Sequence, residues 1–145
     1  MEEVYNVVLI DDDHVSNFLH AQVLEESGLV KNSYIYTQPD KVLKFLRAAA
    51  GDHPDFRREG VPDLMLLDLK MPGLDGFEFM EEYNHIPGIE RLRIQVYMVT
   101  SSNHPRDVEK ARQYRMAGYV NKPLTGESLN AMLGSCRENR LDIEP

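Results

Sequence analysis

Cysteine is scarce in this sequence, and basic side chains are outnumbered by acidic ones. A single cysteine, Cys136, excludes an internal disulfide and a cysteine-based zinc site, and it suits a reducing compartment. Lys and Arg number 16 against 24 Asp and Glu, which gives a formal net charge of −8. The chain therefore lacks the basic face that binds nucleic acid and the polybasic cluster that binds anionic membranes. We expect neither as a partner.

Long apolar runs are also missing. No stretch approaches the roughly 18 apolar residues of a membrane span. The apolar run within the acidic N-terminal segment MEEVYNVVLIDDD is too short for a signal peptide. A length of 145 residues is that of one domain. These features predict a soluble, cytoplasmic protein with a single domain over residues 1–145 and a core over about 4–137.

Short apolar runs rich in β-formers alternate with amphipathic stretches along the whole chain. Because the runs are continuous rather than alternating, they favour strands buried on both faces of a parallel sheet. The predicted strands cover residues 4–10, 33–37, 64–67, 94–100 and 119–120. Strand–helix units in series predict an α/β domain with right-handed crossovers and helices on both faces of the sheet.

The stretches between the strands have the spacing of amphipathic helices. The apolar positions that share a helix face are Val15, Phe18, Leu19 and Val23 in the first helix, Leu43, Leu46 and Ala50 in the second, Phe77, Met80 and Tyr83 in the third, and Leu129, Met132, Leu133 and Cys136 in the fifth. Pro39 and Asp40 lie in the first turn of the second helix. The fourth helix is predicted over about residues 105–116, and Thr125 is the predicted N-cap of the fifth. We predict that these apolar faces point into the core.

Two polar segments interrupt this alternation. Residues 51–62 form an insertion that exceeds the usual connection of about 2–6 residues. Residues 137–145 form a charged tail that we expect to fray beyond the last helix. The histidines at 14, 20, 53, 85 and 104 have no metal-ligand spacing, and we predict them at the surface. Cys136 is predicted to be inert in the core.

Polar residues gather where the predicted strands end. Those that end or follow a strand are Asp11, Asp12, Asp13, Asp68, Thr100 and Lys122. Because the carboxyl ends of parallel strands form the ligand crevice of an open sheet, we expect these side chains on one rim. Asp13 is the exception, since an acid at that point favours capping of the following helix.

Such a group of side chains suits metal and phosphoryl chemistry. Clustered carboxylates stay ionised together mainly when a cation lies among them. Hard oxygen ligands favour Mg²⁺ over zinc, with Mn²⁺ as the expected substitute. A metal there could bridge to a phosphoryl oxygen, while the hydroxyl and the ammonium group neutralise the others. A carboxylate of the group could itself accept the phosphoryl group.

The segments VVLIDDD, PDLMLLDLKMPGLDGFEF, VYMVTSS and AGYVNKPL occur in the order and spacing of a known family. Over about residues 4–137, the chain resembles the CheY-like receiver domain of two-component response regulators. The resemblance implies a doubly wound, flavodoxin-like sheet of five parallel strands in the order 2-1-3-4-5, flanked by five helices. It also implies a phosphoacceptor switch, not an enzyme with a separate substrate.

The resemblance further implies a role for each acid of the rim. Asp68 would be the phosphoacceptor. Asp12 and Asp68 would bind Mg²⁺ directly, and Asp11 would bind it directly or through water. The backbone carbonyl of Lys70 would complete the protein ligands.

The remaining implied roles concern the phosphoryl group and the partners. Thr100 and Lys122 would each bind a phosphoryl oxygen, Tyr119 would be the switch aromatic, and Lys122–Pro123 would be a cis peptide bond. A histidine kinase or a histidine phosphotransfer protein would be the donor. An unidentified protein would act downstream, and a homodimer could form through the fourth helix, fifth strand and fifth helix.

Other functions remain open at this point. Lys70 and Ser102 replace the acid or amide associated with fast hydrolysis, so we predict a long-lived phosphoryl group. About nine residues follow the fifth helix, and we therefore expect a stand-alone receiver, either a relay shuttle or a phosphorylation-dependent binder. A pseudo-receiver adaptor that is never phosphorylated is the first alternative. An Mg²⁺-dependent phosphohydrolase is the second, although Lys70 occupies the position where its general acid would lie.

Overall fold

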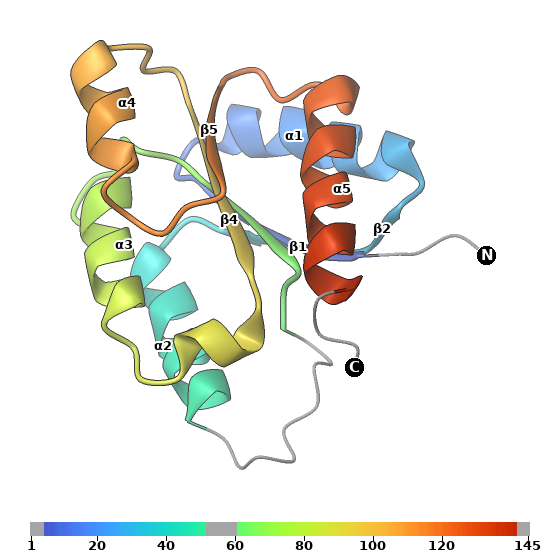
Figure 1. Ribbon diagram of the computed structural model, residues 1–145. Coiled ribbons are helices and arrows are strands. Elements are labelled where there is room, and N and C mark those ends of the chain that lie inside the picture. The colour runs from blue at the N-terminus through green and yellow to red at the C-terminus, as the bar shows by residue number, and fades with distance from the viewer. Residues whose placement is uncertain (1–4, 52–60, 142–145) are drawn as a thin grey trace.

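The chain folds into three layers, with a parallel sheet between two groups of helices (Figure 1). The computed structural model describes residues 5–51 and 61–141, and the burial of side chains as far as residue 138. The strand order is β2-β1-β3-β4-β5, and every neighbouring pair is parallel. The predicted fold class and strand order are confirmed.

Strands and helices alternate along the chain. The strands are β1 (Tyr5–Ile10), β2 (Val30–Tyr36), β3 (Leu64–Leu67), β4 (Gln95–Thr100) and β5 (Gly118–Asn121). The helices are α1 (His14–Ser27), α2 (Pro39–Ala50), α3 (Gly76–Asn84), α4 (Pro105–Ala111) and α5 (Gly126–Leu141). A short 3-10 helix, η1 (Ile89–Leu92), precedes β4 and has no counterpart among the predicted elements.

Each face of the sheet buries its own core, because successive side chains of a strand point to opposite faces. Val8 and Ile10 of β1 pack with residues of α2, α3 and α4. Val7 and Leu9 pack instead with residues of α1 and α5. All of β3 and nearly all of β1 are buried, as predicted from their continuous apolar runs.

The edge strand β2 differs from its prediction. It begins at Val30, earlier than the predicted residue 33, and it leaves Tyr34 and Ile35 exposed. Burial on both faces is therefore wrong for β2. As the outermost strand it has a neighbour on one side only, and helices cover the edge of a sheet less completely than its middle.

The predicted core face of α1 is wrong in the first half of the helix, whereas Val23, the last residue of that face, is half-buried and packs against the core. Val15, Phe18 and Leu19 are 67%, 63% and 49% exposed. The buried residues of this helix are Ser16, Asn17, His20 and Leu24. His20 was predicted at the surface and is a second correction. The physical reason is that the inner face of α1 meets the polar rim of the sheet, where buried backbone groups need polar partners.

The other helices bury the faces predicted for them. The buried sets include Leu43, Leu46 and Ala50 of α2, Phe77, Met80 and Tyr83 of α3, and Leu129, Met132, Leu133 and Cys136 of α5. Two predicted caps are also present. The carboxylate of Asp13 accepts a hydrogen bond from the Val15 N–H, and the hydroxyl of Thr125 accepts one from the Ser128 N–H.

Two helix ends lie elsewhere than predicted. Helix α4 ends at Ala111 rather than near residue 116, because the Ala117 N–H already donates to the Val96 carbonyl at 2.7 Å as β5 begins to pair with β4. Helix α5 continues to Leu141, so part of the expected frayed tail is helical. Residues 52–60 of the predicted insertion and residues 142–145 of the tail lie outside the described residues.

No helix within residues 5–51 and 61–141 is both long enough and apolar enough to cross a bilayer.

Candidate functional site

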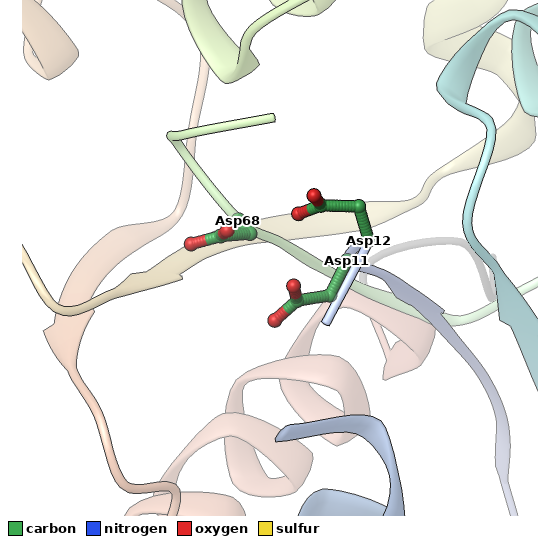
Figure 2. Close-up of side chains that lie close together, drawn as sticks. All are labelled: Asp11, Asp12 and Asp68. Carbon is green, nitrogen blue, oxygen red and sulfur yellow. The ribbon is translucent and has the colours of Figure 1, made fainter. Parts of the chain in front are cut away.

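Three carboxylates meet at the carboxyl ends of the neighbouring strands β1 and β3 (Figure 2). Asp11 and Asp12 follow β1, and Asp68 follows β3. An oxygen of each carboxylate lies within 4.8 Å of an oxygen of the other two. Asp11 and Asp68 are buried, and Asp12 is the most exposed of the three. The predicted convergence of these acids is therefore confirmed.

Backbone contacts fix the positions of the two buried acids. The Asp68 N–H donates to the Ile10 carbonyl at 2.9 Å, which aligns the ends of β1 and β3. The Asp13 N–H donates to Oδ1 of Asp11 at 3.0 Å. Gly76 lets α3 begin close to the site, since a Cβ at this position would lie 2.8 Å from the Asp68 carbonyl oxygen. The turn between β3 and α3 therefore leaves no room for a side chain there.

The electrostatics of Asp68 favour a bound cation. Burial raises the pKa of the Asp68 carboxyl above its ordinary value, and the negative charge of Asp11 raises it further. The charge of Lys122 and a hydrogen bond from the Thr100 side chain act in the opposite direction without cancelling the rise. A divalent cation would relieve this repulsion. The three carboxylates, all hard oxygen ligands, fit Mg²⁺.

Lys122 supplies a positive charge at the edge of the acidic group. Its Nζ lies 2.7 Å from Oδ2 of Asp11 and 3.5 Å from Oδ1 of Asp68. Burial alone would lower the pKa of the Lys122 ammonium. The hydrogen bond to Asp11 and the charges of Asp68 and Asp11 outweigh burial and raise that pKa above its ordinary value. The peptide bond between Lys122 and Pro123 is cis, as predicted.

Thr100 and Tyr119 meet near the loop that follows β4. Thr100 ends β4 and is 1% exposed, and its side chain favours the charged form of Asp68, which lowers the pKa of that carboxyl. The hydroxyl of Tyr119 donates to the Ser102 carbonyl at 2.8 Å, and the side-chain amide of Asn121 donates to the same carbonyl at 2.9 Å. The phenol of Tyr119 is thus joined by a hydrogen bond to the loop that begins at Thr100.

Lys70 and Ser102, the two residues behind the prediction of slow hydrolysis, have different surroundings. Lys70 is exposed and lies beyond Asp68 in the loop after β3. The Ser102 hydroxyl donates to a carboxylate oxygen of Asp107 in α4. The slow hydrolysis itself stays a prediction.

Sequence reasoning missed two residues next to the site, Asn17 and His20 on the inner face of α1. The side-chain amide of Asn17 donates to the Asp11 carbonyl at 2.8 Å. Nε2 of His20 accepts a hydrogen bond from the Leu124 N–H at 3.4 Å. The sequence did hold a signal. Two polar residues three positions apart, and therefore on one helix face, follow shortly after the three consecutive aspartates. The apolar face of α1 has the same helical spacing and was chosen instead.

Residues 7–134 match the sequence pattern of the response regulator receiver domain. The chain belongs to this family. Receiver domains of response regulators act in two-component signalling, and the rim just described lies at the carboxyl edge of the sheet, where the family resemblance implied it.

Individual relatives agree with this assignment. The chain is 27% identical over 138 residues to the probable methanogenesis regulatory protein FilR2 of Methanothrix harundinacea, covering 94% of this chain and 84% of that protein. It is 27% identical over 127 residues to the polar-differentiation response regulator DivK of Brucella ovis, covering 83% of this receiver and 85% of DivK. These relatives are named as regulators.

A solved structure supports the fold independently. A two-component response regulator from Cytophaga hutchinsonii superposes with a TM-score of 0.82 at 25% identity, over 94% of this receiver and 99% of that chain.

Proposed function

We propose that this receiver domain accepts a phosphoryl group on Asp68 with the help of Mg²⁺. The metal would be bound by Asp11, Asp12, Asp68 and the backbone carbonyl of Lys70. The observation that carries the proposal is the surroundings of one carboxylate. Asp68 is buried, faces two further acids within 4.8 Å, and has Nζ of Lys122 at 3.5 Å, while the Thr100 side chain favours its charged form.

The reaction is a displacement at phosphorus. A carboxylate oxygen of Asp68 attacks the phosphorus of a phosphohistidine on the donor protein. An O–P bond forms as the donor's P–N bond breaks, and the imidazole leaves with the electron pair and takes up a proton. Mg²⁺ would neutralise the acids and the negative charge of the transferred group.

Lys122 and Thr100 bind the phosphoryl oxygens that the metal does not contact. Lys122 is protonated at neutral pH, as an exposed lysine would be, the neighbouring acids raise its pKa further above neutrality, and its ammonium group is already close to Asp68. A fixed cation and a fixed hydroxyl stabilise the charge that develops during transfer without further reorganisation.

Phosphorylation then changes the surface around α4, β5 and α5. The added charge at Asp68 attracts the Thr100 hydroxyl, and the loop after β4 moves with it. Tyr119 follows, because its hydroxyl bonds the Ser102 carbonyl in that loop. The changed face binds a downstream protein or a second copy of the chain, and no separate substrate is turned over.

The protein acts in the cytoplasm, and its donor is a histidine kinase or a histidine phosphotransfer protein. The donor has to approach the rim beside α1, where Val15, Phe18 and Leu19 are exposed. A docked protein that covers these side chains would remove apolar area from water.

The test is intact-mass analysis after incubation with Mg²⁺ and acetyl phosphate, over a time course. The wild type is compared with Asp68→Asn, with a chelator control, and with Asp40→Asn, which removes an exposed acid from α2. We expect a gain of one phosphoryl group in the wild type and in Asp40→Asn, and none in Asp68→Asn or with the chelator.

Other outcomes would favour the alternative functions. Mg²⁺ binding without an adduct from acetyl phosphate or from a phosphorylated histidine phosphotransfer protein would favour the pseudo-receiver adaptor. Continuous release of inorganic phosphate from phosphate monoesters would favour the phosphohydrolase. Slow decay of the adduct would bear out the prediction made from Lys70 and Ser102.

A further inference from the structure

The backbone around Lys122 is anchored from two sides. On one side, the Lys122 N–H donates to the Thr100 carbonyl at 2.9 Å. On the other side, Pro123 has no N–H, so Leu124 is the first residue after Lys122 whose backbone can donate. The Leu124 N–H donates to Nε2 of His20 at 3.4 Å. The lysine is thus positioned by β4 before it and by α1 after it.

The burial of His20 combines this hydrogen bond with apolar packing. The residue is 5% exposed and lies on the same face of α1 as Leu24. Because Nε2 accepts the hydrogen bond, the neutral imidazole carries its proton on Nδ1. The charged groups that act on the pKa of His20 are Lys122, Asp11 and Asp13, which all lie at the rim.

Asn17, one turn earlier on α1, makes a comparable contact to Asp11, the ion-pair partner of Lys122. It is 3% exposed, and its amide N–H donates to the Asp11 carbonyl at 2.8 Å. Among the described residues, no group donates to its Oδ1. Burying an amide whose oxygen has no hydrogen-bond partner costs free energy. The hydrogen bond to Asp11 is the contact that accounts for an asparagine at this position.

Residues 17 and 20 lie three apart and share a helix face. The same face of α1 therefore contacts the backbone beside each member of the ion pair between Asp11 and Lys122, whose charged atoms are 2.7 Å apart. A helix is rigid over one turn, so the two contacts fix the separation of these backbone segments.

We propose that His20 is a positioning residue, whose hydrogen bond to Leu124, together with that of Asn17 to Asp11, sets the place of the Lys122 ammonium group relative to Asp68. This inference rests on the proposed phosphoryl transfer for its effect on rate. Its effect on Lys122 itself does not depend on that function, and the two can be tested separately.

The experiment compares His20→Leu, His20→Gln and Leu24→Ala. Leucine removes the acceptor, whereas the side-chain carbonyl of glutamine can still accept from the Leu124 N–H. Leu24→Ala is the matched control. Leu24 is 1% exposed on the same helix face, and its side chain has no group that can accept a hydrogen bond. Thermal unfolding of each variant records the cost to stability.

The first readout is the NMR chemical shifts of the Lys122 side chain in the protein without donor, which report the surroundings of its ammonium group. We expect these shifts to change in His20→Leu and to match those of the wild type in His20→Gln and Leu24→Ala. The second readout is the rate of phosphorylation by acetyl phosphate at saturating Mg²⁺. We expect on the order of a tenfold decrease in His20→Leu, as for a displaced catalytic group, and near wild-type rates in the other two.

Each other outcome overturns the inference or its premise. Unchanged Lys122 chemical shifts and an unchanged phosphorylation rate in folded His20→Leu would reduce His20 to a packing residue, as would equal changes in Leu24→Ala. If His20→Leu does not fold, His20→Gln decides, since a roughly tenfold loss of rate in this folded variant would exclude an acceptor role. If His20→Leu alone changes Lys122 but the wild type takes up no phosphoryl group, the proposed function is refuted and the positioning role stands.

Discussion

The first half of helix α1 and helix α2 have opposite relations between polarity and burial. Helix α2 buries Leu43 and Leu46 and exposes charged residues such as Lys44. Helix α1 buries Asn17 and His20 and exposes Phe18. The two helices lie on opposite faces of the same sheet (Figure 1).

The difference follows from what each helix contacts. Helix α2 packs against α3, η1 and the sheet in an apolar core, where burial of hydrocarbon supplies the free energy. The first turns of α1 meet the rim beside Asp11 and the loop after Lys122, where backbone groups need hydrogen-bond partners. A helix next to a site can thus be polar inside and apolar outside and still be well packed.

The largest effect should come from the apolar face of α2. Leu46 is fully buried, with an exposed fraction of 0%. We expect Leu46→Ala to lower the free energy of unfolding by about 2–5 kcal/mol, through lost burial and the cavity left behind. Urea unfolding followed by circular dichroism measures it. A loss as small as that of a surface substitution would contradict the core assigned to α2.

A smaller loss should come from the polar inner face of α1. Asn17→Ala removes the donor to the buried Asp11 carbonyl, and we expect it to cost about 1–3 kcal/mol of stability. The same urea titration applies, with Gln22→Ala on the exposed side of α1 as the control. If both variants were equally stable, the polar face of α1 would have no structural role.

The next effect in size should be a dependence of stability on pH that arises from His20 in α1. Burial lowers the pKa of His20 below its ordinary value of 6.5, and the charge of Lys122 lowers it further, against the raising effects of Asp11 and Asp13. A lowered pKa means that the unfolded chain binds the proton more readily. The stability from neutral His20 is therefore present above pH 6.5 and is lost as the pH falls below it.

The measurement is the thermal midpoint between pH 7.5 and 5 for the wild type and His20→Gln. We expect a steeper fall in the wild type than in the variant. Parallel curves would show that His20 is protonated equally in the folded and unfolded chain. His85→Gln serves as the control, because His85 is exposed.

The smallest effect should come from the exposed apolar face of α1. Phe18 is 63% exposed, so we expect Phe18→Ser to change stability by less than about 0.5 kcal/mol. The comparison with Leu46→Ala is direct, since both remove a large apolar side chain from a helix. A loss of similar size in the two variants would mean that α1 packs in the way its apolar spacing predicts.

The candidate site could be predicted from the sequence because topology collects strand ends. Asp11, Asp12 and Asp68 follow strands that are unmistakably apolar, and a parallel sheet brings such residues to one edge whatever the details of packing. Thr100 and Lys122 follow the same rule. Their convergence needed only the positions of the strands and the family pattern.

The inner face of α1 could not be predicted in the same way. Periodicity assigns the apolar side of a helix to the core. It contains no information on whether a neighbouring loop has a backbone N–H that requires a polar partner from the other side of the helix. The contact of His20 with Leu124 joins residues more than a hundred positions apart. The exposure of β2 and the early end of α4 were missed for a related reason, since the apolar pattern within one segment does not record how neighbouring elements cover or end it.

The most direct test of the account is to locate the phosphoryl group. Borohydride converts an aspartyl phosphate to homoserine, which peptide mass spectrometry identifies after digestion of the Mg²⁺-dependent adduct. The account predicts homoserine in place of Asp68 and unmodified Asp11 and Asp12. Homoserine at another acid, or an adduct that borohydride leaves unchanged, would contradict it.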